Sequence, residues 1–187
     1  PEESMTDTAA PATEAMSAFV PAGAIEAYAG LESGLTDEGF AYVGALDSGA
    51  VEVLEFGSFG CPHCKTFYVE DGEALNALIQ SGDIVFIYAP IINADTAYAE
   101  VATVGAFCAA EQGAFGAFHD TMFTWQGTPM SNAILRSVAG ELGLDMDAFN
   151  TCLDAGIPGV QGSLDAARAL MTEVGATGTP AFLVNGE

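Results

Sequence analysis

Residues 51–64 read VEVLEFGSFGCPHC, and this stretch decides the fold. Its first part, Val51 to Phe56, is a β-branched and apolar run bounded by glycine, which predicts a strand. Its last part places Cys61 and Cys64 three residues apart, where a helix over Pro62 to about Gln80 is expected to begin. The Cβ atoms at positions i and i+3 of a helical turn lie about 5 to 6 Å apart, and the separation of their Cα atoms can fall within the range that a disulfide tolerates. The stretch therefore predicts a strand, a turn, and a helix whose first turn carries two cysteines.

The position of these cysteines favours redox chemistry. Cys61 would start the helix, where unpaired backbone N–H groups and the helix dipole stabilise a thiolate. Pro62 suits the first helical position because its missing N–H costs nothing there, and His63 can add positive charge or a hydrogen bond beside the sulfur. Since a stabilised thiolate means a stabilised reduced form, a disulfide between Cys61 and Cys64 would be a good oxidant.

Two structural roles compete with a redox role for this pair, namely half of a zinc site and a static disulfide. Zinc needs two further ligands at suitable spacing, but Cys108, His119 and Cys152 are scattered far downstream. A disulfide that closes so short a loop removes little chain entropy and would stabilise the fold only weakly. We therefore expect redox-active cysteines and no metal.

The remaining segments predict an α/β domain that is interrupted by helices. The other expected elements are a short helix within Ala22–Ser33, strands at Phe40–Gly44, Asp83–Ile92 and Ala181–Val184, and several helices between Thr96 and about Val174. Asn185-Gly186 is a hairpin-turn signal. We therefore expect that the native chain continues into a further strand and a covering helix.

Composition excludes whole classes of partner. The chain of 187 residues has 26 Asp and Glu against 3 Lys and Arg, a formal charge of −23. So few cations cannot neutralise nucleic-acid phosphates or bind an anionic membrane surface, and no run approaches the roughly 18 to 20 apolar residues of a membrane span. The acidity has two interpretations, a solvated surface that keeps a soluble protein monomeric, and adaptation to salty surroundings where screening weakens self-repulsion.

Two motifs together resemble a known family. VLEFGSFGCPHC resembles the active-site strand and motif of the DsbA-like thiol:disulfide oxidoreductases, in the thioredoxin superfamily. GATGTPAFLVNG, residues 175–186, resembles the cis-proline loop and following strand of the same family. The motifs stand in the order that the family requires, with a helical insertion between them. The resemblance implies a thioredoxin fold and the transfer of disulfides to secreted proteins.

This resemblance implies an α/β chain in four parts. Residues 1–38 would be a flexible lead-in with at most a short helix, and residues 39–95 the first part of a thioredoxin-fold domain with the CPHC site. Residues 96–174 would form an inserted all-helical subdomain, and residues 175–187 the cis-proline loop and following strand. The last strand and helix of the fold would be missing from the sequence given.

The resemblance also implies roles for the residues of the CPHC motif. Cys61 matches the attacking, solvent-exposed cysteine, and Cys64 the buried cysteine that resolves the mixed disulfide. Pro62 and His63 match the dipeptide that tunes the redox poise.

Two residues of the second motif match substrate-binding positions. Pro180 matches the cis-proline that faces the disulfide, and Thr179 matches the residue before it, whose backbone pairs with a substrate peptide. Thr179 departs from the Val of the best-known oxidases, and Thr at this position also occurs in related isomerases and in other DsbA-like branches.

Glu55 matches an acidic residue that some family members use near the buried cysteine. A carboxylate there could accept and release the proton of Cys64. Alternation along the strand places Glu55 on the same face as Val51 and Val53. This favours a buried role over the alternative, in which Glu55 faces solvent on an acidic surface.

The insertion carries the other candidate residues. An oxidising compartment favours a disulfide between Cys108 and Cys152, which would close a loop of about 45 residues and stabilise the fold by roughly 4 kcal/mol in the entropic model. The alternative is two free cysteines, buried as small hydrophobic side chains. His119 is expected on the surface of an inserted helix.

The leading hypothesis is a periplasmic or otherwise extracytoplasmic thiol:disulfide oxidase whose signal segment is not part of the sequence given. A substrate thiolate would attack the disulfide to form a mixed disulfide at Cys61, and a membrane quinone-linked partner would reoxidise the pair. The disulfide itself is the redox group, so no cofactor is expected. Two alternatives stay open, a reductase or isomerase of the same fold and a thioredoxin-like binding or chaperone module. The residues before Gly39 are too few for the dimerisation domain that such isomerases usually carry.

Overall fold

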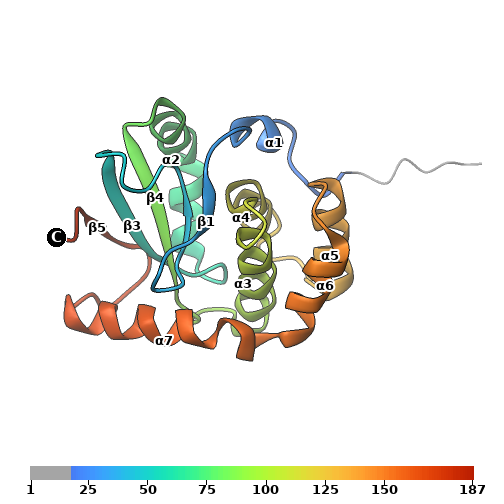
Figure 1. Cartoon of the computed structure of the whole chain (residues 1–187). Coiled ribbons are helices and arrows are strands. Elements are labelled where there is room, and N and C mark those ends of the chain that lie inside the picture. Colours follow the sequence, from blue (N-terminus) through green and yellow to red (C-terminus); the bar gives the residue numbers. More distant parts are fainter. Residues whose placement is uncertain (1–17) are drawn as a thin grey trace, which may run out of the picture.

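A computed structural model describes residues 18–187 as seven helices and a five-stranded sheet (Figure 1). The strands are β1 (Ser33–Leu35), β2 (Ala41–Val43), β3 (Val51–Gly57), β4 (Ile84–Pro90) and β5 (Ala181–Val184). The helices are α1 (Ala24–Ala27), α2 (Pro62–Ser81), α3 (Thr96–Ala110), α4 (Phe115–Thr124), α5 (Asn132–Glu141), α6 (Met146–Ala155) and α7 (Ile157–Glu173). Residues 1–17 of the expected flexible lead-in, 1–38, lie outside the described residues.

The sheet has the strand order β1-β2-β4-β3-β5. β3 and β4 run parallel and are connected through α2, which makes β3–α2–β4 a crossover unit. The other neighbouring strands pair antiparallel. Ala181 at the start of β5 pairs with Phe56 near the end of β3. This pairing brings the loop before β5 next to the loop that carries the cysteines.

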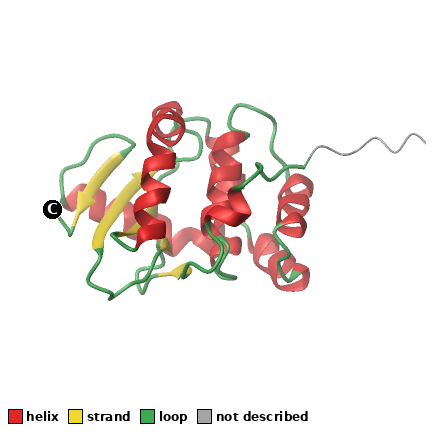
Figure 2. Ribbon diagram, turned by 90° about the horizontal axis from the view of Figure 1, so that it is seen from above, coloured by secondary structure: helices red, strands yellow, loops and turns green. Residues whose placement is uncertain are grey.

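Alternating residues of β4 face two different layers of helices, which lie on both sides of the sheet in Figure 2. Ile84, Phe86 and Tyr88 pack with α2 and the helices of the insertion. Val85 and Ile87 belong to a second cluster with α7. Because β3 pairs in register with β4, alternation places Glu55, the partner of Tyr88, on the face that α2 covers.

The last helix of the expected insertion belongs instead to the sheet. Residues 96–174 were predicted as an all-helical insertion, but α7 packs on the face of the sheet opposite α2, through Ala167, Leu170 and Met171. These three residues form a stripe at helical spacing. Such a stripe shows in the sequence that a helix buries one face, but it does not show which surface covers that face.

A disulfide joins α3 to α6 within the insertion. Cys108 and Cys152 are bonded, with their Cα atoms 5.7 Å apart, so the first of the two alternatives for this pair is correct. Every residue of α3 from Ala102 to Ala110 is buried. A helix that is apolar on all sides fits such a central position, and the disulfide ties α6 to this central helix.

Residues 18–38 depart from the expected lead-in. The helix expected within Ala22–Ser33 is only 4 residues long. Gly23 and Gly30, with φ of 84° and 77°, flank this helix and interrupt the helical backbone. Ser33 to Leu35 then forms the edge strand β1 against β2, which the sequence analysis missed. This segment is therefore part of the folded domain.

The turn expected after β5 is present. Asn185 and Gly186 have φ of 51° and 82°, the left-handed backbone that a type I′ turn requires. Val184 and Glu187 exchange two backbone hydrogen bonds across it. The strand and covering helix expected beyond this turn stay a prediction.

Candidate active site

The two cysteines of the CPHC motif lie where β3 leads into α2. Pro62 is the first residue of α2, and Cys61 is the N-cap residue with an extended backbone. Cys64 follows one turn into the helix, and both cysteines are free thiols. The N-cap position places Cys61 beside the unpaired N–H groups of the first turn, as the sequence predicted.

Cys61 is the more accessible of the two thiols, but it is not openly exposed. Its exposed fraction is 5%, against 1% for Cys64. The expected solvent-exposed cysteine is thus largely covered. The cause is the loop before β5, because the Cys61 thiol donates a hydrogen bond to the carbonyl oxygen of Thr179 at 3.3 Å.

This covering loop contains the expected cis peptide bond, between Thr179 and Pro180. The side chain of Thr179 is itself held in place, because Asn93 donates a hydrogen bond from Nδ2 to its Oγ1 at 2.8 Å. Asn93 lies just after β4. The residue before the cis-proline is therefore fixed from the sheet side as well as from Cys61.

Gln126 and Gly60 fix the loop that presents Cys61. The Nε2 atom of Gln126 donates hydrogen bonds to the carbonyl oxygens of Phe59, at 2.6 Å, and Cys61, at 3.0 Å. Gly60 approaches the backbone so closely that a Cβ atom there would overlap the carbonyl oxygen of Ala94. The sequence does not indicate either residue, because a single Gln or Gly far from its contact carries no periodic signal.

His63 and Lys65 act on the loop of Cys61 through hydrogen bonds to main-chain atoms or from them. The His63 side chain is exposed, and its backbone N–H is the group that donates to the Cys61 sulfur. The ammonium group of Lys65 donates to the carbonyl oxygen of Gln126 at 2.9 Å. Both residues therefore contribute mainly through backbone and loop contacts.

The surroundings shift the pKa values of the two thiols in opposite directions. Burial disfavours the charged form of Cys61, but hydrogen bonds from the Thr179 side chain and from two backbone N–H groups outweigh this effect and lower the pKa of Cys61. Burial raises the pKa of Cys64 well above its usual range, and the nearby charge of Glu55 raises it further. Cys61 is thus the group that ionises, while Cys64 stays a thiol.

Glu55 lies buried beside Cys64, as alternation along the strand predicted. Its exposed fraction is 2%. Burial raises the pKa of Glu55 to about 8, and a contact with the Cys64 thiol opposes part of that rise. The carboxyl group is therefore neutral at neutral pH and can donate a proton to Cys64.

His119 lies in the core beside this site, so its expected surface position is wrong. Its exposed fraction is 7%, and it packs among the rings of Phe59, Tyr68, Phe86, Tyr88, Phe115 and Phe123. The reason is that every residue of α4 from Phe115 to Phe123 is buried. The sequence signal that could have revealed this burial is the density of aromatic residues around His119.

The zinc alternative does not fit this geometry. Cys108 and Cys152 are bonded to each other and so cannot complete a site with Cys61 and Cys64. Among residues 18–187, no group of three or more His, Cys, Asp or Glu side chains is placed to hold a metal ion.

A dithiol in the first turn of a helix, crossed by a cis-proline loop on a β-α-β unit, defines a thioredoxin-fold site. A family model described as Thioredoxin matches residues 37–187, and the chain belongs to this family. A curated relative, the Na⁺/H⁺ antiporter NhaA 1 of Salinispora arenicola, is 33% identical over 137 residues, covering 73% of this chain and 20% of the antiporter. The chain thus spans about a fifth of the length of this relative. Within the described residues, no helix is both long and apolar enough to cross a membrane.

Two solved structures share the fold. MdbA, a thiol-disulfide oxidoreductase from Corynebacterium diphtheriae, superposes with a TM-score of 0.70 at 16% identity, over 84% of this chain and 86% of MdbA. The thiol-disulfide exchange protein alpha-DsbA2 from Wolbachia pipientis gives a TM-score of 0.59 at 24% identity, over 78% of this chain and 76% of that protein. The α/β architecture is therefore the thioredoxin fold in its DsbA-like form.

Proposed function

We propose that this chain is a thiol:disulfide oxidoreductase of DsbA type that acts as an oxidase on protein substrates. The observation that carries the proposal is the placement of the two thiols within one helical turn, with Cys61 at the N-cap of α2 and Cys64 buried behind it. This placement lowers the pKa of Cys61 and raises the pKa of Cys64. A stabilised Cys61 thiolate stabilises the reduced form, which makes the disulfide a ready donor. The activities of MdbA and alpha-DsbA2 agree with this assignment.

The reaction proceeds through a mixed disulfide at Cys61. A substrate thiolate attacks Sγ of Cys61, and the Cys61–Cys64 bond breaks with its electron pair leaving on Cys64. Glu55 donates its proton to this new thiolate. A second substrate thiolate then attacks the substrate sulfur of the mixed disulfide, and Cys61 leaves as a thiolate. The substrate loses two electrons, and the sulfur atoms of Cys61 and Cys64 receive them, so no cofactor is required.

The proposed partners are the ones that the resemblance to the DsbA-like family implies. Substrate proteins bring two thiols to the loop at Thr179 and Pro180, and a membrane quinone-linked partner takes the electrons from the reduced pair. The Cys108–Cys152 disulfide supports an oxidising, extracytoplasmic compartment. The large negative charge favours a monomer in solution.

The test is transfer of the disulfide to a reduced peptide with two cysteines, followed by mass spectrometry. The oxidised chain should convert the peptide to its disulfide, and Cys61→Ser should abolish the transfer. Cys64→Ser, given the oxidised peptide, should accumulate a mixed disulfide at Cys61 because no second thiol resolves it. Thr172→Ala, exposed on α7, is the control that should keep the transfer rate.

A reductase or isomerase is the second candidate, and Thr179 before the cis-proline is the observation that favours it. Equilibration of the Cys61–Cys64 pair with glutathione buffers separates the two directions. An oxidase should give a potential well above the glutathione couple, toward about −120 mV, whereas a reductase should lie near about −270 mV. A binding or chaperone module would keep its binding of unfolded protein after Cys61→Ser.

A further inference from the structure

A small cavity beside Cys64 contains polar atoms that lack partners. Within the described residues, Oε1 of Glu55, the hydroxyl of Tyr88 and Nε2 of His119 are buried without a hydrogen-bond partner. Glu55 and His119 both line a cavity of about 10 Å³, together with Cys64. This is about the space that one water molecule requires. Leaving buried polar atoms without partners costs free energy. We therefore expect that these atoms bind a water molecule in the cavity or take part in the reaction.

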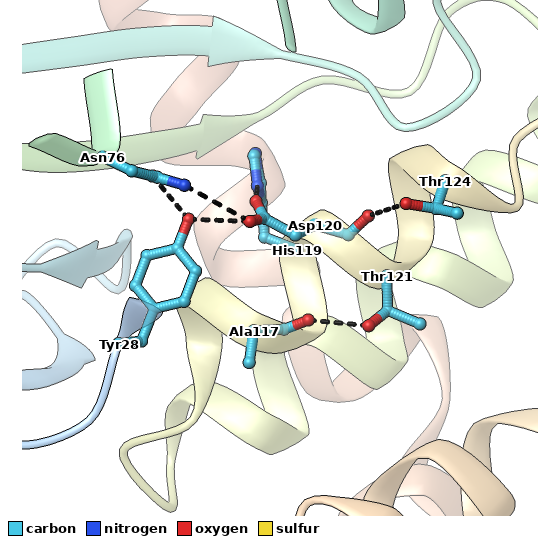
Figure 3. A network of polar contacts seen from close by, with 7 residues as sticks. All are labelled: Tyr28, Asn76, Ala117, His119, Asp120, Thr121 and Thr124. Carbon is cyan, nitrogen blue, oxygen red and sulfur yellow. Dashed lines mark hydrogen bonds and ion pairs between the residues drawn. The ribbon is translucent and has the colours of Figure 1, made fainter. Parts of the chain in front are cut away.

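A polar network of residues that also line this cavity begins at His119 (Figure 3). Nδ1 of His119 lies 3.1 Å from Oδ1 of Asp120. The other carboxylate oxygen of Asp120 accepts hydrogen bonds from the hydroxyl of Tyr28, at 3.0 Å, and from Nδ2 of Asn76, at 3.5 Å. Asp120 therefore connects the ring of His119 to side chains of α2 and of the segment after α1.

This network reaches a surface groove. A groove of about 620 Å³ runs between the α1 segment and α2. Asp120, Asn76, Tyr68 and Gly72 line the groove and also line the small cavity. These four residues are therefore shared by the wall of the groove and the wall of the small cavity.

We propose that the His119–Asp120 pair carries protons between this groove and the Glu55–Cys64 pair through the small cavity. The proposal rests on the proposed oxidoreductase function, because it supplies the proton that disulfide transfer requires at Cys64. His119 and Asp120 thereby gain a role in the reaction without touching the substrate.

The relay takes up one proton from solvent for each disulfide that is transferred. When the Cys61–Cys64 bond breaks, Cys64 leaves as a thiolate and takes the proton of Glu55. Water in the cavity gives a proton to the Glu55 carboxylate and takes one from Nε2 of His119. The imidazole regains a proton at Nδ1 from the Asp120 side, which exchanges with solvent in the groove. No electrons move in this relay. The imidazole begins with its proton on Nε2 and ends with it on Nδ1, and the reverse relay restores the first arrangement when the pair is reoxidised and Cys64 gives up its proton.

The geometry explains why a second entrance for protons, away from Cys61, is useful. A substrate held in a mixed disulfide lies over Cys61 and the Thr179 loop, and Cys64 has an exposed fraction of only 1%. Asn76 lies 15 residues after Cys61 along α2, a distance of about 20 Å at the rise of an α-helix. The groove therefore stays open while the substrate covers the other end of the helix.

Titratable groups surround His119 and the small cavity on several elements. The titratable groups that face the imidazole and the cavity are Asp120 on α4, Cys64 and Tyr68 on α2, Glu55 on β3, Tyr88 on β4, and Tyr28 after α1. Burial raises the pKa of all three tyrosines above the usual range, which keeps them neutral. The relay therefore depends on the carboxyl groups and the imidazole.

The test is the pH profile of a single turnover. The oxidised chain is mixed with excess reduced peptide, quenched with acid and assayed for its Cys61–Cys64 disulfide. Below about pH 7, Glu55 carries its own proton, so His119→Phe should match the wild type. Above about pH 8, Glu55 is ionised, and the variant should be about tenfold slower, less than the loss of a direct acid–base group. Asp120→Asn should show the same pH dependence.

The controls separate a proton path from a packing effect. Phe118→Leu changes a buried side chain of the same helix that packs against Phe149, and it should leave the pH profile unchanged. A His119→Phe rate that equals the wild type at every pH, or falls by one constant factor at every pH, overturns the proposal. If His119→Phe does not fold, Asp120→Asn decides by the same criterion.

A failure of the proposed function gives a different result. In that case the wild type itself transfers no disulfide to the peptide. The path is then tested by infrared spectroscopy, as the rate at which the Glu55 carboxyl band shifts after transfer of the reduced protein to D₂O. Slower exchange in His119→Phe supports the path, and equal exchange overturns it.

Discussion

At the scale of single residues, two identical side chains acquire opposite chemistry from their different surroundings. Cys61 is an N-cap residue beside the free N–H groups of a first turn, whereas Cys64 lies one turn deeper against Glu55 and is fully buried. The sequence predicted this difference because helix start, spacing and strand alternation are local properties. It did not predict the contact of Cys61 with Thr179, because that contact depends on where β5 pairs with β3.

Glu55→Gln should stabilise the protein, and increasingly so as the pH rises from about 4.5 to 8. The pKa of Glu55 is about 8 in the fold and about 4.3 in an unfolded chain. Between these values the folded state holds a proton that the unfolded state has released, so a rise in pH lowers the free energy of unfolding. Above pH 8 this effect lowers the free energy of unfolding of the wild type by roughly 4 to 5 kcal/mol. Gln does not ionise and therefore avoids this loss. Urea unfolding of both reduced proteins from pH 4 to 9 measures the difference, and a pH-independent difference would contradict this prediction.

Alkylation of the reduced protein should label Cys61 well before Cys64. Cys61 has the lowered pKa and the larger exposed fraction, while the raised pKa of Cys64 keeps it a thiol. Only the thiolate reacts quickly with iodoacetamide. Timed labelling at mildly acidic pH, read by peptide mass spectrometry, checks the order. Faster labelling of Cys64 would reverse the assignment of the two roles.

At the scale of the elements, periodicity predicted most of the helices and strands but not their partners. β5 has the bounds expected from its apolar run and turn signal, and α2 differs by one residue from the predicted helix. The edge strand β1 was missed because three residues are too few for a clear alternation. The packing of α7 on the sheet, the hydrogen bonds of Gln126 and the burial of His119 depend on tertiary placement, which has no local period.

Removal of the Cys108–Cys152 disulfide should cost about 4 kcal/mol of stability in the entropic account. The disulfide closes a long loop, with a sequence separation of 44, between the buried helix α3 and α6. The double variant Cys108→Ala with Cys152→Ala should unfold at a lower guanidinium concentration than the wild type, with Cys61 and Cys64 reduced in both samples. A loss below about 1 kcal/mol would mean that the unfolded chain gains little freedom from opening this loop.

At the scale of the whole molecule, the site lies at the seam between the sheet and the helical insertion. The sheet provides Glu55 at the end of β3 and positions Thr179 through β5, while the insertion provides Gln126 and His119. The insertion therefore holds the loop of Cys61 and encloses the cavity beside Cys64. The resemblance of the two sequence motifs identified Glu55 and Thr179, which the sheet provides or positions. It did not identify Gln126 or a role for His119, which the insertion provides.

Salt should stabilise this protein over a wide range of concentrations, because its acidic groups have very few partners of opposite charge. The chain carries 26 Asp and Glu against 3 Lys and Arg. In the described part, Arg136 and Arg168 each pair with an exposed aspartate, and such surface pairs contribute little. The remaining like charges repel one another in the compact state, and this repulsion weakens as the screening length falls from about 10 Å at 0.1 M salt to about 3 Å at 1 M.

The melting midpoint of the chain should therefore rise between these two salt concentrations, and by similar amounts in NaCl and KCl, because screening does not depend on the identity of the cation. Sucrose at matched osmolality is the control for general exclusion of solutes from the protein surface, which also favours the folded state, and it should give a smaller rise. A midpoint that stays level or falls with added salt would show that the acidic side chains are too far apart, or too well solvated, to destabilise the fold.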